Sequence, residues 1–430
     1  MTKDSAEPSA SGQPSNRSLF SMIGPGILVA ATGVGAGDLA GGAFAGAKLG
    51  PAILWIVITG AGLKYLLCEG LARWQLQTGV SIANGVFRGT PEFVRWGFLT
   101  YVAIWSVCIG GMLMSACGEC AHAIIPIGDP ATGRLIWGII HSIAAILMVR
   151  AGGFRLFERV MMAFIGVMFV TVLCVTILSR PEWPEVIRGL VIPTIPQAQD
   201  SGIDWALTLM AGVGGTLTLL CYGSWIREKK RTDVSSLNAC RVDLGAGYLM
   251  TAVFGICMVI LGSRIPFDDS LKGVNLINSL SNDMQKSLGS AGTTAAWMFR
   301  IGAWGAVFSS LLGVWQSIPE LVSEMLPKPM RKQDLPSRFL LAIGIVPMCL
   351  LPFSLVRIQV IAGITGAVFL PLLALALLIL PFGRVGRESG FRHHLLVTAG
   401  LALCMVFFGF MAYRTILLKL SKLFAVFVFS

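Results

Sequence analysis

Residues 23–47 read Ile23-Gly-Pro-Gly-Ile-Leu-Val-Ala-Ala-Thr-Gly-Val-Gly-Ala-Gly-Asp38-Leu39-Ala-Gly-Gly-Ala-Phe-Ala-Gly-Ala47. This hydrophobic stretch of about 25 residues is long enough to cross a lipid bilayer as a helix. Gly33, Gly35 and Gly37 interrupt it, and each glycine costs a helix roughly 1 kcal/mol relative to alanine. Asp38 follows directly, and an ionisable side chain at membrane depth indicates a functional site. Many secondary transporters build substrate sites from discontinuous helices near the membrane midplane, and the stretch predicts such a broken helix.

The composition indicates a helical protein that crosses the membrane many times. Mean hydropathy is +0.77, 55% of the residues are hydrophobic and 13% are charged, whereas soluble domains contain about 25% charged residues. A single flexible anchor with a stray aspartate would not explain the apolar stretches that follow along the whole chain. We expect an all-α polytopic membrane protein with about eleven transmembrane helices. They are placed at residues 22–47, 51–76, 96–124, 134–149, 157–179, 203–225, 242–263, 294–318, 338–354, 358–381 and 395–413.

The net charge of +11 is explained by membrane topology. If the N-terminus is cytoplasmic, the inside segments carry about twice as many lysines and arginines as the outside segments, as the positive-inside rule requires. We therefore expect a multi-pass protein of the cytoplasmic membrane with a cytoplasmic N-terminus and no nucleic-acid partner. The ten cysteines lie almost entirely within apolar runs, which predicts packing residues rather than disulfides.

A second interrupted span follows a proline-rich linker at residues 181–202. Gly212-Val-Gly-Gly215 breaks the sixth apolar stretch near its middle, as the glycine cluster breaks the first. Five spans separate the two, so the halves form a five-plus-five inverted repeat with discontinuous helices 1 and 6 that cross at the substrate. The alternative is that glycines only permit close helix packing, which suits Gly41, Gly42 and Gly46. The expected parts are a disordered cytoplasmic tail (1–21), the first repeat (22–180), the linker (181–202), the second repeat (203–382), and span 11 with a C-terminal tail (383–430).

Several motifs resemble the natural-resistance-associated macrophage protein (NRAMP) family. They are Gly24-Pro25-Gly26, Ala72-Arg73-Trp74-Gln75-Leu76-Gln77-Thr78-Gly79, Glu185-Val-Ile-Arg-Gly-Leu-Val-Ile-Pro193 and Gln359-Val360. The resemblance runs through nearly the whole chain. It implies a proton-coupled divalent metal transporter, a symporter, with the same inverted-repeat, LeuT-like architecture.

The expected metal site departs from the pattern of the family. Where the family carries Asp-Pro-Gly-Asn in its first broken helix, this chain has Gly35-Ala36-Gly37-Asp38, so the aspartate is lost and the asparagine has become an aspartate. Leu219, Leu220 and Cys221 stand at the Met-Pro-His of helix 6, and Thr365 stands at the glutamine of helix 10. Glu119 matches a carboxylate of the family's proton path, whereas its companion acid falls at Ala116.

The remaining donors favour a hard cation. A thioether ligand selects soft metals, whereas carboxylates, carbonyls and water suit Mg²⁺, Ca²⁺ or Mn²⁺. We expect a Mn²⁺- or Mg²⁺-like ion to be held by Asp38, by freed carbonyls around Gly33–Gly37 and Leu219–Cys221, and by the Thr365 hydroxyl. One acid also suits a proton, Na⁺ or an organic solute, for which Trp225 and Phe369 would line a larger cavity. A chain that has lost transport is the third alternative.

Other ionisable residues within the spans have both structural and functional interpretations. Lys64 and Glu69 on span 2 are expected to be structural, with Lys64 pairing to another helix. Arg300 either takes part in coupling or lies near the outer end of span 8. Glu119 and His122 are three residues apart on one helical face, which predicts either a proton relay or a satisfied polar pair.

Enzyme motifs fail in their context. Gly35-Ala-Gly37-Asp-Leu-Ala40 fits the dinucleotide fingerprint formally but has no preceding strand, and no P-loop, HExxH or GxSxG occurs. Cys117 and Cys120 lack the further ligands of a zinc site. We expect no enzyme activity and no cofactor other than the transported cation and a coupling proton. The expected partners are the divalent cation and the lipid bilayer, with the protein a monomer.

Overall fold

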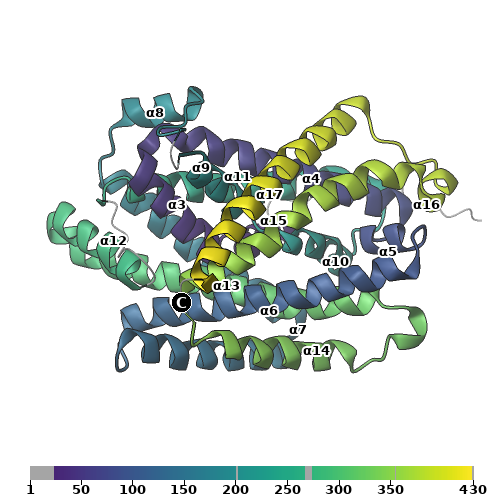
Figure 1. Cartoon of the computed structure of the whole chain (residues 1–430), viewed down its shortest axis with the longest axis horizontal. Coiled ribbons are helices and arrows are strands. Elements are labelled where there is room, and N and C mark those ends of the chain that lie inside the picture. The colour runs from purple at the N-terminus through teal and green to yellow at the C-terminus, as the bar shows by residue number, and fades with distance from the viewer. Residues whose placement is uncertain (1–23, 200–201, 267–273, 354, 429–430) are drawn as a thin grey trace, which may run out of the picture.

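The computed structural model describes residues 24–199, 202–266, 274–353 and 355–428. The predicted tail at residues 1–21 lies outside this range. Every regular element of the described part is a helix, and the long helices form one bundle (Figure 1). The described part is all-α, as predicted, and contains seven helices that are long and apolar enough to cross a membrane.

The helices follow the predicted spans in order. Span 1 is divided into α2 and α3, and span 6 into α9 and α10, while spans 4 and 5 both lie in α7. The bounds of the long helices are α4 Leu54–Thr78, α6 Glu92–Ile124, α7 Pro130–Leu178, α11 Leu237–Gly262, α13 Gly292–Met325, α15 Leu355–Ile379 and α17 Leu395–Val428. The divided and shorter helices are α2 Pro25–Gly33, α3 Ala36–Leu49, α5 Ile82–Phe87, α8 Trp183–Val191, α9 Gly202–Gly212, α10 Cys221–Glu228, α12 Val274–Ser287, α14 Leu335–Ile345 and α16 Arg384–Glu388.

Two details differ from the expected spans. A loop was expected between residues 149 and 157, but α7 continues through it with a single kink at Gly153 (φ 58°, ψ −177°). Glycine reaches this conformation at no steric cost, so the chain changes direction without an extended loop. The linker at 181–202 contains α8, whose Gly189 lies against the carbonyl of Pro51.

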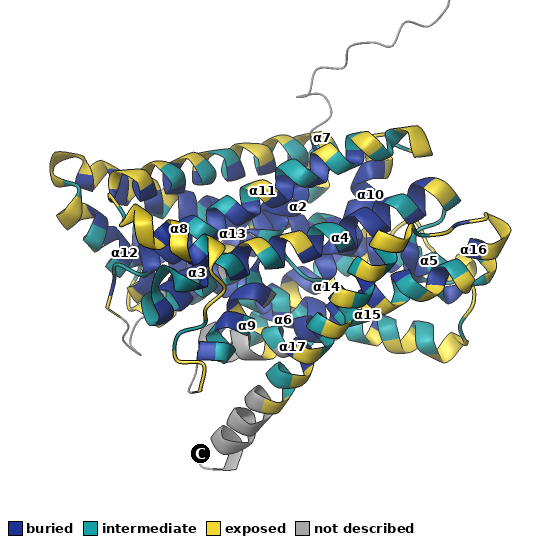
Figure 2. Ribbon diagram, turned by 90° about the horizontal axis from the view of Figure 1, so that it is seen from above, coloured by how far each residue is buried: buried dark blue, intermediate teal, exposed yellow. Residues whose placement is uncertain are grey.

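The interior of the bundle is formed around α11 and α13. Helix α11 packs against α2, α3 and α4, and α13 packs against α6 and α7. Figure 2 shows the buried residues gathered around these central helices, with exposed residues on the outer faces of the bundle. The broken helices pack against these central helices, α2 and α3 against α11 and α10 against α13. Unwound backbone within a membrane protein needs such cover from neighbouring helices.

Close approach of α3 to α11 depends on a glycine. A Cβ atom at Gly46 would lie 2.1 Å from the carbonyl oxygen of Val259. Backbone atoms cannot yield as a flexible side chain does, so any larger residue at Gly46 must separate the two helices. Close packing, the alternative role for glycines, therefore applies to Gly46, whereas Gly41 on the same helix has open space around it.

We predict that Gly46→Ala destabilises the fold by about 1–3 kcal/mol, because the methyl group would overlap the backbone of α11. The measurement is the thermal unfolding midpoint of the purified protein in detergent. Gly41→Ala is the matched control on α3 and should leave the midpoint unchanged or raise it, since alanine favours helix. Equal midpoints for the two variants would contradict the packing role of Gly46.

Candidate functional site

The first break lies between α2 and α3, as predicted. Helix α2 ends at Gly33 and α3 begins at Ala36, and Val34 (φ −76°, ψ 79°) and Gly35 (φ −127°, ψ −149°) depart from helical geometry. Two serines of α13 satisfy carbonyls at this break. Ser309 and Ser310 donate to the Ala31 carbonyl at 3.1 and 3.2 Å, and Ser310 lies 3.4 Å from the Val34 oxygen.

The second break separates α9 from α10. Helix α9 ends at Gly212, and Gly214 and Gly215 then take positive φ values of 75° and 78°. A short 3₁₀ helix, η2 (Leu217–Leu220), leads into α10. Only glycine adopts two successive left-handed conformations at low cost, so the glycine pair both ends α9 and turns its last carbonyls away from the helix axis.

The two breaks contact each other through their glycines. A Cβ atom at Gly33 would lie 2.7 Å from the carbonyl carbon of Gly214, and one at Gly212 would lie 3.3 Å from the Gly37 oxygen. Backbone therefore meets backbone where helices 1 and 6 cross. This crossing is the one predicted from the paired glycine clusters.

Asp38 lies in the first turn of α3, next to this crossing. Asp38 is 2% exposed, and its carboxylate faces the backbone amides of Gly35 in the first break and Gly214 in the second. The start of a helix favours a negative charge, and a buried carboxylate normally accepts hydrogen bonds. Asp38 therefore presents two buried oxygen ligands at the meeting point of the two breaks.

Lys64 of α4 reaches the same place and is fully buried. Its ammonium group donates to the Gly215 carbonyl oxygen at 2.7 Å and also to the Val213 carbonyl oxygen. Its charge acts on Asp38. The freed carbonyls of helix 6 are thus those of Val213 and Gly215, a few residues before the expected stretch Leu219–Cys221. The sequence feature that pointed to this contact is a lysine in the middle of an apolar span, for which pairing to another helix was expected.

The other predicted ligands surround the second break. Leu219 and Cys221 are fully buried in and after the η2 turn. Thr365 donates its hydroxyl to the Ala362 carbonyl of its own helix at 2.9 Å, and Tyr101 donates to the Thr365 carbonyl at 2.7 Å. The next residue along α15, Gly366, lies against Thr216 of the break. The structure thus places Gly35, Gly37 and Asp38 at the crossing, and Leu219, Cys221 and Thr365 around it.

The predicted proton-path residues lie together on α6, away from the crossing. Glu119 and His122 are 8% and 7% exposed. Arg134 of α7 lies 3.6 Å from a Glu119 carboxylate oxygen, and the His122 Nδ1 atom accepts a hydrogen bond from the Ile127 amide at 3.3 Å. Cys117 and Cys120 on the same helix are buried free thiols.

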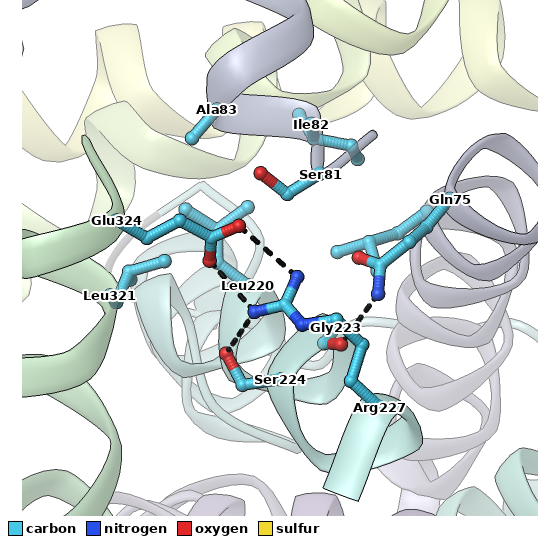
Figure 3. Close-up of a pocket in the computed structure, with 11 residues that line it drawn as sticks. Gln75, Ser81, Ile82, Ala83, Leu220, Gly223, Ser224, Arg227, Leu321 and Glu324 are labelled. Atoms are coloured by element: carbon cyan, nitrogen blue, oxygen red, sulfur yellow. Dashed lines mark hydrogen bonds and ion pairs between the residues drawn. The ribbon is translucent and has the colours of Figure 1, made fainter. Parts of the chain in front are cut away.

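A small cavity lies between α4, α5, α10 and α13 (Figure 3). Its volume is about 10 Å³, enough for about one water molecule. Arg227 forms a two-pronged ion pair with Glu324 beside it, at 2.9 and 3.1 Å, and joins α10 to α13. The described residues that line the cavity include no aromatic side chain. Trp225 instead donates to the Ser317 hydroxyl at 3.0 Å within the core.

Two other ionisable residues have partners that fit structural roles. Glu69 contacts both Arg73 and Arg241, at 2.5 and 2.9 Å, and ties α4 to α11. Arg300 donates to Ser281 of α12 at 3.2 Å and lies over the Trp297 ring. Neither residue contributes to the crossing.

Residues 26–418 match the family model described as natural resistance-associated macrophage protein-like. The chain belongs to this family. The predicted resemblance is therefore confirmed over nearly the whole chain.

Similar proteins include transporters from bacteria and plants. One is the divalent metal cation transporter MntH of Chromohalobacter salexigens, 26% identical over 60% of this chain and 58% of its own. Another is the metal transporter Nramp3 of Oryza sativa subsp. japonica, 23% identical over 63% and 49%. The chain spans about half the length of the curated relatives it matches.

Solved structures share the fold at low sequence identity. A manganese transporter from Eremococcus coleocola superimposes with a TM-score of 0.77 at 16% identity, over 97% of this chain and 91% of the other. MhsT in complex with L-phenylalanine gives a TM-score of 0.58 at 17% identity, over 91% and 97%. The chain therefore has the LeuT-like fold that was predicted, a fold shared by proteins of low sequence identity.

We predict that Gly214→Ala lowers the stability of the protein by roughly 1–2 kcal/mol, because an L side chain resists the left-handed backbone required there. Gly37→Ala is the control at the same crossing, since its Cβ atom would meet nothing closer than 3.9 Å. The free energy of unfolding in denaturant would measure both. A Gly214→Ala variant as stable as Gly37→Ala would contradict the strained turn.

Proposed function

We propose that this protein is a secondary transporter that moves a divalent metal cation across the membrane by alternating access. The observation that carries the proposal is the buried Asp38 carboxylate, which lies where two broken helices cross and faces the backbone amides of Gly35 and Gly214. Unwound backbone at this depth supplies further oxygen ligands. Family membership and the similarity to divalent metal cation transporters support the metal as substrate.

The donor set supports a hard ion, Mn²⁺- or Mg²⁺-like. The residues that the structure describes contain no group of three or more histidine, cysteine or acidic side chains able to hold a metal together. A cation at the crossing would therefore be held by one carboxylate, main-chain carbonyls and water. This is the pattern of hard cations that retain part of their hydration shell.

An organic solute is less well supported. The cavity beside α10 has room for about one water molecule. Trp225 and Phe369, the aromatic residues that such a solute would need, are each only 2% exposed. The relatives from Chromohalobacter salexigens and Oryza sativa are also named as metal transporters.

The proposal also covers the location and orientation of the protein, its oligomeric state and its coupling to protons. We place the protein in the cytoplasmic membrane with its N-terminus inside, as a monomer without enzyme activity. The basic residues of the expected inside segments support this orientation. Proton symport through Glu119 and His122 is supported by the burial of both side chains on one face of α6.

We predict that Asp38→Asn lowers Mn²⁺ uptake into liposomes at least about tenfold, since it removes the charged ligand from a site of low dielectric constant. A metal-sensitive dye inside the liposomes reports the uptake, and Mg²⁺ is compared in the same assay. Asp204→Asn is the control, because Asp204 pairs with Arg414 at 3.4 Å at the start of α9. Wild-type liposomes that admit neither ion would overturn the metal proposal.

We predict that Glu119→Gln abolishes the acid stimulation of uptake while metal binding stays intact. The reason is that glutamine preserves the size of the side chain next to Arg134 and His122 but cannot carry a proton. Uptake is measured over a pH series, and metal binding is measured separately by titration. If the variant retains the pH dependence of the wild type, Glu119 is not part of the proton path.

A further inference from the structure

The Lys64 ammonium group occupies ligand atoms that a transported cation would need. It donates to the carbonyl oxygens of Val213 and Gly215, both freed by the break in helix 6. Carbonyl oxygens of this kind, with a carboxylate, are the ligands that hard cations take in proteins. The side chain is fully buried, so no solvent competes for these contacts.

The charges at the crossing also disfavour a divalent ion while the Lys64 ammonium group is in place. Lys64 and Asp38 lie close enough to interact electrostatically, the one as a base and the other as an acid. A divalent ion that bound to Asp38 with Lys64 in place would meet a fixed positive charge in a medium of low dielectric constant. Repulsion between charges grows as the dielectric constant falls and in proportion to the charge of the ion.

We propose that Lys64 is a tethered cation that competes with the transported ion for the crossing of the two broken helices. The ammonium group withdraws from Val213 and Gly215 when a divalent ion binds beside Asp38, and it returns when the ion leaves. This inference rests on the proposed transport of a cation. A lysine suits the exchange because its compact charge sits on a flexible four-carbon stem, so it moves without a shift of α4.

A purely structural lysine would behave differently. In that case the ammonium group only satisfies the carbonyls and neutralises Asp38, and the metal binds elsewhere or with Lys64 in place. Removal of the charge would then weaken the fold without improving metal binding. The two roles therefore predict opposite changes in affinity.

The test is Mn²⁺ binding to the purified full chain in detergent, for wild type, Lys64→Gln and Lys64→Arg. Glutamine retains an N–H donor for the carbonyls but has no charge, whereas arginine keeps the charge. We expect Lys64→Gln to lower the Kd for Mn²⁺ at least about tenfold and Lys64→Arg not to lower it. Asp38→Asn in the Lys64→Gln background should remove the gain. A folded Lys64→Gln protein that binds Mn²⁺ no more tightly than wild type overturns the proposal.

Uptake into liposomes separates this proposal from the proposed function. Tighter binding by Lys64→Gln without uptake by either protein supports competition between Lys64 and the metal ion for the crossing but overturns transport. Uptake by wild type without tighter binding by Lys64→Gln supports transport and overturns the tethered cation. If neither protein binds or transports Mn²⁺, both proposals are wrong.

A second measurement uses the wild type alone and covers the case in which Lys64→Gln does not fold. A structure of the protein at high Mn²⁺ concentration, with the ion located by anomalous scattering, shows the lysine directly. We expect the ion beside Asp38 and the Lys64 nitrogen away from the carbonyls of Val213 and Gly215. An ion beside Asp38 with both lysine contacts intact, or no ion there, contradicts the proposal.

Discussion

Backbone carbonyls freed inside a membrane protein need partners, and this requirement governs the centre of the molecule. Breaking helices 1 and 6 releases carbonyls at a depth where an unsatisfied polar group costs several kcal/mol. Side chains from two neighbouring helices form hydrogen bonds with these carbonyls and so offset this cost. Ser309 and Ser310 of α13 bond to the end of α2, and Lys64 of α4 bonds to the end of α9. These contacts link α13 to the first break and α4 to the second.

The breaks themselves were predictable from the sequence because their cause is local. Glycine clusters destabilise helix wherever they occur, and Gly33–Gly37 and Gly212–Gly215 repeat the pattern at corresponding places in two halves. Asp38 was found by the same local reasoning, since a charge within an apolar span needs an explanation. The crossing of the two spans followed from their inverted topology, and the structure shows it as glycine against glycine.

Contacts between distant parts of the chain were harder to predict. Lys64 lies 149 and 151 residues from the carbonyls it bonds, and the sequence does not indicate which side of α4 faces helix 6. The expected carbonyls, at Leu219–Cys221, came from aligning a family motif that this chain lacks, and that alignment did not indicate the contacts of Lys64 with the Val213 and Gly215 carbonyls. The serines of α13 carried no signal, because hydroxyls are common in transmembrane helices and bond to their own backbone.

The charge of the empty site matters as much as that of the loaded one. A carrier that alternates access must also reorient without its substrate, and a buried carboxylate without a counter-ion then costs several kcal/mol. Asp38 is the acid at the crossing, and Lys64 acts on it electrostatically. In the proposed transport cycle, release of a cation would otherwise leave negative charge between the two broken helices. A lysine that takes the place of the departing ion would offset this charge, so the empty protein could close around Asp38 as the loaded one does.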